Sequence, residues 1–395
     1  MKLHFTDQTF SFELLRAASY GLYGGSEIGE VLATAKQIRE GDFESWYVAW
    51  QRTAARIEAL AAQVRDQGHP ISAGPAFLRA SNYYRTAEFF LAPDDPRRIE
   101  TFEKSRTTFW QFLELSGLCV ERVRIPYEGT TLPGYFYRAD ESRAPRRTLL
   151  SLGGFDSTGE ELYFFAAAAA ILRGYNVLTF EGPGQGEPLR VHHLPARPDY
   201  EVPVRAAVDY LWTRPEVDRE RIALMGSSLG GYYAPRAAAF EPRVKALISH
   251  GVFFDWWATQ TKTKPALGLL LDKWKSPRGV QAVLDVAMRF NSELRWTVKN
   301  AQWVLGAQDP VELISQMQRY SLADTAGLIR QPTLILHGAR DHFIPREQVD
   351  MFYAALKAPK TLRIFTEEEG AEEHCQFGNM ALLHQVLFDW LDETL

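Results

Sequence analysis

Residues 1–120 carry apolar side chains at the three- and four-residue spacing of amphipathic helices, with almost no alternating pattern. This spacing is clear over residues 27–39 and 42–67. In the second segment Trp46 and Trp50 stand one helical turn apart on the apolar face. Buried packing is the favoured interpretation of that face, and a ligand wall is the alternative. We therefore predict a helical domain over this part of the chain.

The pattern changes near residue 118, from where apolar runs of strand length alternate with helical stretches. Five of these runs are apolar throughout, as in interior parallel strands with helices on both faces of the sheet. We expect strands at residues 118–127, 129–138, 147–152, 175–180, 222–225, 244–250, 332–337 and 361–365. This order predicts a mostly parallel, doubly wound α/β core over residues 121–251 and 331–395.

Between residues 252 and 330 the alternation gives way to helical stretches with many aromatic side chains. Such an insertion beside a strand end predicts a helical lid, and its wide apolar rings suit an aromatic or polyketide-like substrate. The alternative is a helical excursion that buries its own aromatic side chains. The aromatic residues concerned include Phe253, Trp256, Trp257, Trp274, Phe290, Trp296, Trp303 and Tyr320.

The composition of the 395 residues, 46% hydrophobic and 24% charged, is that of a globular protein larger than one typical domain. The net charge of -5 at pH 7 provides no basic field, so nucleic acid and anionic membrane surfaces are not expected as partners. The first residues lack the apolar core of a signal peptide, and no apolar stretch reaches membrane length. We expect a cytoplasmic protein.

Cysteine and histidine usage gives no sign of a metal site. The two cysteines, Cys119 and Cys375, are too few for a disulfide framework or a cysteine-ligated metal. The histidines show no metal-ligand spacing with acidic residues on a shared face. We therefore expect free thiols, no metal and no cofactor.

The apolar run 222–225 leads into a Gly-x-Ser-x-Gly turn, with Ser228 between Gly226 and Gly230, and a stretch of small residues follows. A serine hydroxyl becomes a nucleophile when a base takes its proton, and a sharp strand-to-helix turn holds it within reach of a histidine. We predict that Ser228 is this nucleophile. Ser227 occupies the first variable position of this pattern and is interpreted as a spacer.

The partners of such a serine follow in the chain order acid, then base. Asp341 lies in the loop after the strand at 332–337, where its carboxylate can orient a histidine. His374 follows the last strand in a loop that leads into the terminal helix, and we predict that it is the base. His337 is interpreted as structural, and His342 as a loop residue pointing elsewhere.

Two backbone N–H groups are predicted to form the oxyanion hole: that of Leu229, directly after the nucleophile, and that of Phe155. Phe155 follows a glycine pair after the strand at 147–152, and glycines let the backbone approach the reacting oxygen closely. The glycine-rich turn at residues 182–186 resembles a phosphate loop only superficially. It lacks the lysine of that motif, so nucleotide binding is not expected.

Together these motifs resemble the α/β-hydrolase fold. Within it, they resemble the group that includes dihydroxypseudooxynicotine hydrolase and the fungal hydrolases that shorten polyketide chains in pigment synthesis. The resemblance covers most of the chain. It is carried by the helical amino-terminal domain and by residues 153–161, 182–187, 226–234, 335–341 and the pair His374-Cys375.

In that group the serine, aspartate and histidine of these motifs are catalytic, which implies the same role for Ser228, Asp341 and His374. An acidic residue after the oxyanion loop faces the active site of the nicotine-degrading enzyme. Asp156 holds the matching place, with a shorter side chain than the glutamate of that enzyme. The resemblance also implies cleavage of a carbon–carbon bond beside a ketone, and it is consistent with a homodimer.

We accordingly expect a serine hydrolase that works through an acyl-enzyme and cleaves a C–C bond next to a ketone in an aromatic or polyketide-like small molecule. A carboxylesterase, lactonase or amidase with the same triad is the alternative, because the first half of the mechanism is shared. A hydrolase-fold protein that binds without turnover is the alternative from another class. Candidates for substrate contact are Asp156, Tyr83, Tyr232, Phe253, Trp256 and Trp257.

Overall fold

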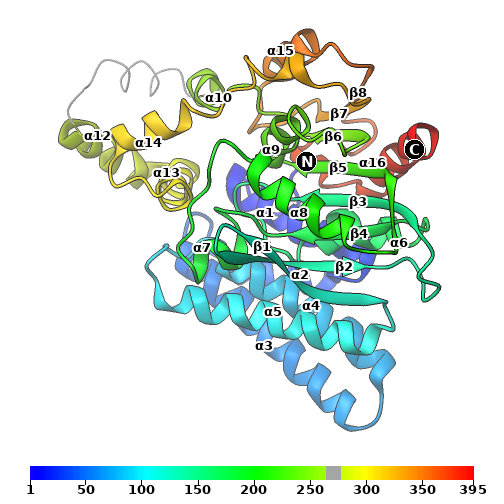
Figure 1. Ribbon diagram of the computed structural model, residues 1–395. Helices are drawn as coiled ribbons and strands as arrows, with labels where there is room; N and C mark the ends of the chain where they lie inside the picture. The colour runs from blue at the N-terminus through cyan, green and yellow to red at the C-terminus, as the bar shows by residue number, and fades with distance from the viewer. Residues whose placement is uncertain (264–276) are drawn as a thin grey trace. The chain divides into compact units, whose positions relative to one another are not determined.

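A computed structural model describes residues 1–263 and 277–395 (Figure 1), so Trp274 of the predicted insertion lies outside the described residues. The chain divides into two compact units. The first comprises Met1–Leu118 and Met288–Asn300, and the second comprises Cys119–Ala287 and Ala301–Leu395.

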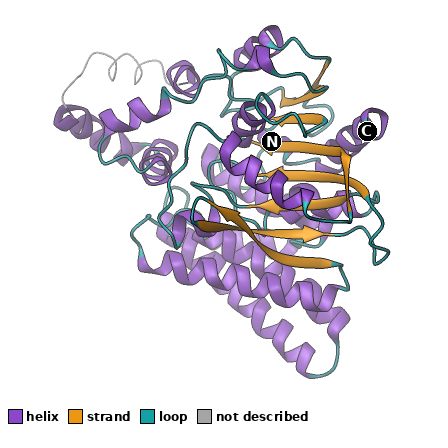
Figure 2. Cartoon of the chain, viewed as in Figure 1, coloured by secondary structure: helices purple, strands orange, loops and turns teal. Residues whose placement is uncertain are grey.

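The first unit is helical (Figure 2). Its helices are α1 (Gln8–Ser19), η1 (Tyr20–Tyr23), α2 (Ile28–Ala35), α3 (Phe43–Asp66), α4 (Pro70–Glu88) and α5 (Pro96–Ser116). An aspartate caps the amino end of α1, α3 and α5, and its carboxylate accepts hydrogen bonds from N–H groups of the first turn. These residues are Asp7, Asp42 and Asp95. Trp46 and Trp50 are fully buried on one face of α3, as expected for a packed core.

Residues 288–300, which the sequence assigned to a lid, group with the helical unit instead. The hydroxyl of Ser292 donates to Asp7 at 2.6 Å, and the indole N–H of Trp296 donates to the carbonyl of Phe89 at 3.2 Å. The Trp296 ring also stacks on the Phe89 ring at 4.6 Å. The predicted insertion is therefore divided between the two units, because the Trp296 ring packs against Phe89 of the helical unit.

The second unit contains an eight-stranded sheet with the order β1-β2-β4-β3-β5-β6-β7-β8 (Figure 1). Strands β1 and β2 pair antiparallel, as do β2 and β4, and the remaining pairs are parallel. The predicted mostly parallel α/β architecture is confirmed. The strands are β1 (Val120–Tyr127), β2 (Thr130–Tyr137), β3 (Arg146–Leu152), β4 (Asn176–Phe180), β5 (Val217–Ser227), β6 (Ala246–His250), β7 (Thr333–Gly338) and β8 (Lys360–Phe365).

Helices connect these strands, and every residue of β4, β6 and β7 is buried. The described helices and helical turns between and after the strands are η2 (Tyr163–Ala167), α6 (Ala168–Ile171), α7 (Gly186–Arg190), α8 (Glu201–Trp212), α9 (Gly230–Ala238), α10 (Trp256–Thr263), α12 (Pro277–Phe290), α13 (Ser292–Leu305), α14 (Pro310–Met317), η3 (Ala326–Leu328), α15 (Arg346–Ala355), η4 (His374–Gln376) and α16 (Met380–Thr394). Helices α12 and α13 each cross the division between the two units.

Because β5, β6, β7 and β8 run parallel, their carboxyl ends lie along one edge of the sheet. In open α/β sheets this is the edge at which ligands bind. The loops that follow β5, β7 and β8 carry the three residues predicted to be catalytic. Among the described helices, none has the length and apolar character needed to cross a bilayer.

Candidate active site

Ser228 stands in a sharp turn between β5 and α9. Its backbone φ is 59°, a left-handed conformation that residues other than glycine rarely adopt. The Ser228 N–H donates to the carbonyl of His250 at 2.9 Å. The turn depends on glycines, because a Cβ on Gly226 would lie 2.0 Å from the carbonyl oxygen of Gly230. This strained strand-to-helix turn has the form of a nucleophile elbow.

The structure brings Ser228, His374 and Asp341 into one hydrogen-bonded chain. Nδ1 of His374 lies 2.6 Å from Oδ2 of Asp341, and Nε2 lies 3.0 Å from Oγ of Ser228. Because an ionised carboxylate only accepts hydrogen bonds, Nδ1 carries the imidazole proton. Nε2 of the neutral ring is then the acceptor for the serine proton, as general-base activation requires.

Burial and the facing charge shift the pKa of Asp341 in opposite directions, and the same holds for the pKa of His374. Burial alone would raise the pKa of Asp341, but the facing His374 outweighs it and holds this pKa at about 2. Burial likewise disfavours the charged form of His374, yet the Asp341 carboxylate raises its pKa well above the usual value. Oδ1 of Asp341 also accepts the N–H groups of Phe343 and Ile344, each at 2.9 Å. The carboxylate is therefore fixed and ionised.

The glycine pair after β3 packs directly against the elbow. A Cβ on Gly154 would lie 2.8 Å from both the backbone nitrogen of Leu229 and the Cβ of Ser228. Only a residue without a side chain allows this approach. The loop that carries Phe155 thus lies beside the Leu229 N–H, so both predicted oxyanion donors belong to one corner of the second unit.

The Gln185 side chain is hydrogen-bonded to the loop that carries Phe155, a contact that the sequence did not predict. Its amide nitrogen donates to the carbonyls of Gly153 at 2.6 Å and Gly154 at 3.1 Å, while its amide oxygen accepts the Gly182 N–H at 3.0 Å. The side chain is buried. The glycine-rich turn at 182–186 therefore holds the carbonyls of the oxyanion loop. The close spacing of the glycines marked this turn in the sequence. That spacing did not indicate which part of the protein the turn contacts.

Comparison with known proteins agrees with this geometry. Residues 144–368 match the family described as serine aminopeptidase, S33. Hydrolase acrC of Aspergillus aculeatus is 38% identical over 97% of this chain and 96% of its own length. The 20-hydroxy-prefusarin hydrolase FUS2 of Gibberella moniliformis is 37% identical over 99% of this chain and 97% of its own. The chain belongs to this α/β-hydrolase family.

Solved structures extend the likeness to the whole fold. That of the 2,6-dihydroxy-pseudo-oxynicotine hydrolase superposes with a TM-score of 0.75 at 25% identity, over 96% of this chain and 95% of that one. The structure of AbyA5, 17% identical with a TM-score of 0.67, shares the fold. The resemblance inferred from the motifs is thereby confirmed, as is the assignment of the chain to the α/β hydrolases.

In this α/β hydrolase, aromatic side chains lie against the histidine of the triad and against the loop of Phe155 within the second unit. The ring of Phe343 meets that of His374 edge-on at 5.1 Å. The Phe155 ring on the oxyanion loop meets Trp256 edge-on at 5.6 Å, and Trp256 in turn meets Tyr320 at 5.1 Å. Part of the predicted insertion, α10 and the segment around residue 320, is thus connected to the oxyanion loop by ring contacts.

The other predicted substrate contacts of the second unit have differing surroundings. Phe253 is buried, with its ring 6.5 Å from that of Trp256. Tyr232 is buried on α9 and its hydroxyl donates to the carbonyl of Pro198 at 2.9 Å. Asp156 and Trp257 are half-buried. Contact of these residues with a substrate stays a prediction.

Tyr83 belongs to the helical unit rather than to the unit that carries the triad. It is fully buried, its hydroxyl donates to Glu30 at 2.7 Å, and its oxygen accepts the Glu27 N–H at 2.9 Å. Burial raises its pKa far above the usual value. Its polar group is engaged inside the helical unit. Contact of Tyr83 with a substrate stays a prediction.

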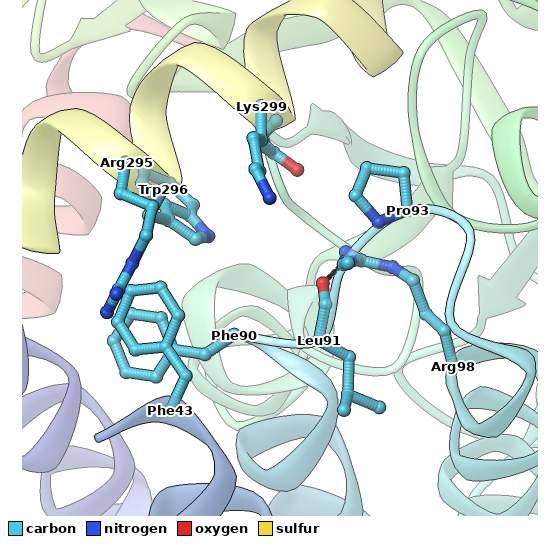
Figure 3. A pocket seen from close by; sticks show the side chains of 10 residues that line it. Phe43, Phe90, Leu91, Pro93, Arg98, Arg295, Trp296 and Lys299 are labelled. Atoms are coloured by element: carbon cyan, nitrogen blue, oxygen red, sulfur yellow. Dashed lines mark hydrogen bonds between the residues drawn. The ribbon is translucent and has the colours of Figure 1, made fainter. Parts of the chain in front are cut away.

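A pocket also lies within the helical unit, and none of the predicted site residues lines it (Figure 3). Its aromatic wall is the parallel stack of Phe43 and Phe90 at 4.4 Å, and the guanidinium of Arg295 lies 3.9 Å from the centre of the Phe43 ring. Arg295 also donates to the carbonyl of Gly41. These contacts fasten residues 288–300 to the unit. The lining residues are Phe43, Phe90, Leu91, Ala92, Pro93, Arg98, Arg295, Trp296, Lys299 and Asn300.

Proposed function

We propose that the chain is a serine hydrolase in which Ser228 is the nucleophile, His374 the general base and Asp341 the acid that orients it. One observation carries this proposal. The Oγ atom of a serine with a backbone φ of 59° lies 3.0 Å from Nε2 of a histidine, and Nδ1 of that histidine donates to a buried carboxylate at 2.6 Å. Nucleophile, base and orienting group in this order are the parts that acyl transfer requires.

In the proposed reaction, Oγ of Ser228 attacks the substrate carbonyl while its proton moves to Nε2 of His374. The N–H groups of Leu229 and Phe155 stabilise the oxyanion. When the tetrahedral adduct collapses, the bond to the leaving group breaks, and its electron pair takes the proton from His374. An acyl-enzyme remains. His374 then removes a proton from the water that attacks the ester carbon. It returns this proton to Oγ of Ser228 as the C–Oγ bond breaks, which releases the acid and restores the serine.

We further propose that the bond cleaved is a C–C bond next to a ketone in an aromatic or polyketide-like substrate. The names of two similar proteins, 20-hydroxy-prefusarin hydrolase and 2,6-dihydroxy-pseudo-oxynicotine hydrolase, support this substrate class. The aromatic rings support it as well, because Phe343 lies against His374 and Trp256 lies against Phe155 on the predicted oxyanion loop. A carbon leaving group needs a ring or a second carbonyl to delocalise its electron pair, and flat apolar walls suit such a group.

Product analysis in D2O separates C–C cleavage from ester cleavage. Pairs of aryl ketones and aryl esters with the same acyl group are offered to the native protein, and the leaving group is examined by mass spectrometry. The proposal predicts that the acyl-phenol or aryl diketone is hydrolysed, and that the leaving ring carbon of the acyl-phenol gains one deuteron from His374. Ester cleavage leaves no deuterium on carbon.

Other results of the same assay would contradict the proposal. Ser228→Ala is the control, because it removes the attacking oxygen and must abolish turnover of both substrates. Turnover of esters, lactones or amides alone, with every ketone untouched, replaces the C–C assignment with the esterase alternative. Binding of the ketones without any turnover or acyl-enzyme supports the non-catalytic alternative.

A further inference from the structure

A second buried hydrogen-bonded chain lies beside the triad. Oγ of Ser227 is 3.0 Å from Nδ1 of His250, and Nε2 of His250 is 2.7 Å from Oε1 of Gln376. All three side chains are buried, those of His250 and Gln376 completely. We infer that Ser227, His250 and Gln376 are positioning residues that hold the loop carrying the base against the elbow carrying the nucleophile. This inference rests on the proposed function of the triad.

The direction of each hydrogen bond follows from burial and from the amide of Gln376. Complete burial lowers the pKa of His250 to about 3, so its ring is neutral. The Gln376 amide nitrogen faces the carbonyl of Glu373 at 3.4 Å, which leaves the amide oxygen to accept from Nε2–H of His250. Nδ1 of His250 then accepts a hydrogen bond from the Ser227 hydroxyl. The chain runs from Ser227 to the carbonyl of the residue that precedes His374.

At the far end of this chain, the backbone is held in an unfavourable conformation. Cys375 and Gln376 follow the base directly and have φ values of 56° and 54°, both in the left-handed region. Two successive residues other than glycine adopt this conformation only where their surroundings impose it. The Gln376 side chain provides such a constraint, because it is completely buried and bonded to His250.

At the near end, His250 contacts the elbow through both its side chain and its backbone. Ser227 is the last residue of β5 and pairs with His250 across the sheet, while the His250 carbonyl accepts the Ser228 N–H at 2.9 Å. The next residue, Gly251, is also close to the base: a Cβ there would lie 3.5 Å from Cε1 of His374. The end of β6 therefore supports the nucleophile and the base together.

The chemistry of the chain favours positioning over a second reaction centre. The third member is an amide, which carries no negative charge with which to stabilise a protonated imidazole. A histidine with a pKa of about 3 does not retain a serine proton at neutral pH. Ser227 is also buried rather than open to a substrate. The three residues can instead set the distance between His374 and Ser228, and general-base catalysis depends steeply on that distance.

Gln376→Met tests the inference, because methionine keeps the volume of the side chain and removes both of its hydrogen bonds. The readout is the labelling of Ser228 by a fluorophosphonate, with kinact and KI separated, alongside thermal unfolding. We expect kinact to fall by about 100-fold, as for misplacement of a catalytic group by about 1 Å, with KI unchanged.

Gln331→Met is the matched control. Gln331 is also buried, and its amide donates to the carbonyls of Ala238 and Glu241. It precedes β7, at the amino ends of the parallel strands, whereas the triad lies at their carboxyl ends. This variant is expected to lose thermal stability and keep the native kinact. Equal kinact in the two variants, with only stability reduced, would overturn the inference.

Two further variants keep the test decisive. Gln376→Glu retains an acceptor for Nε2–H of His250, so it recovers part of the kinact that methionine loses, and its added charge moves the pH midpoint of labelling upward. Should Gln376→Met fail to fold, Ser227→Ala decides instead. It removes only the hydroxyl that begins the chain, and kinact falls while KI stays constant; an unchanged kinact contradicts the inference.

Failure of the inference differs from failure of the proposed function. If the native protein is not labelled at Ser228, the triad assignment itself is wrong. If the native protein is labelled there and Gln376→Met reacts at the native kinact, the triad stands and only the positioning chain is rejected.

Discussion

The conformation of single residues sets the geometry of this site. Ser228 has a left-handed backbone, and its hydroxyl faces a histidine whose other nitrogen is held by Asp341. Two backbone N–H groups hold the remaining oxygen of that carboxylate. The Asp341 carboxylate therefore fixes both the tautomer and the orientation of His374. In the proposed reaction, its removal is expected to cost more than the loss of one hydrogen bond.

Asp341→Asn is predicted to lower kcat/KM by about 10⁴-fold, because an amide in place of the carboxylate no longer fixes the reactive tautomer of His374. The protein should remain folded, since asparagine has nearly the same shape. Steady-state hydrolysis of an activated ester measures the effect. A loss below about tenfold would show that Asp341 does not orient the base.

The pH dependence of Ser228 labelling reports on the same pair. Only neutral His374 accepts the serine proton, so labelling rises with pH through the pKa of His374, which Asp341 holds above the ordinary value of about 6.5. In Asp341→Asn the negative charge that raises the pKa of His374 is lost, while the burial that lowers this pKa remains. The midpoint is therefore predicted to move to lower pH. An unchanged midpoint would mean that another group controls the reaction.

At the scale of the elements, the site depends on how closely the loop after β3 approaches the turn after β5. A Cβ on Gly154 would lie 2.8 Å from the Leu229 nitrogen and from the Ser228 Cβ, and the Gln185 side chain donates to the carbonyls of Gly153 and Gly154. The close approach sets where an oxyanion can be bound. Loss of one oxyanion donor typically costs about 100- to 1000-fold in rate.

Gly154→Ala is predicted to lower kcat by a comparable factor, about 100-fold or more, because the added methyl group pushes the oxyanion loop away from Leu229. Gly29→Ala provides the comparison, since no atom lies within 4 Å of the added Cβ and the position is helical. That variant should keep the native kcat. Similar kcat values for both alanine variants would remove Gly154 from the oxyanion site.

The sequence predicted the elements of the second unit well, because each strand is a local apolar run that ends at a turn signal. It also singled out Ser228, Asp341 and His374, which stand in local motifs with a fixed chain order. It did not find His250 and Gln376, whose contact joins residues 126 positions apart. Buried histidine and glutamine have no periodic signature, and only the fold shows which polar groups meet in the core.

At the scale of the whole molecule, the division of the chain into units differs from the predicted boundaries in one respect. The aromatic pattern of residues 252–330 indicated burial but did not identify the surface that covers each ring. Trp296 and its neighbours pack in the helical unit, whereas Trp256 and Tyr320 pack in the unit of the sheet. A helical unit built from residues 1–118 alone therefore lacks part of its core.

Trp296→Ala is predicted to destabilise the helical unit by about 2 kcal/mol, because a half-buried ring stacked on Phe89 and its indole hydrogen bond are lost. Chemical denaturation followed by circular dichroism measures the change. Phe290→Ala, at a position whose ring is 87% exposed, should be close to neutral. Equal stability of the two variants would argue against the packing of residues 288–300 in this unit.

Identification of the nucleophile tests the proposed mechanism most directly. The native protein, Ser228→Ala and Ser227→Ala are treated with a fluorophosphonate and examined by intact and peptide mass spectrometry. The predicted result is a single adduct on Ser228 in the native protein, the same adduct forming more slowly in Ser227→Ala, and none in Ser228→Ala. An adduct on another residue, or one that persists in Ser228→Ala, would contradict the assignment of Ser228 as the nucleophile.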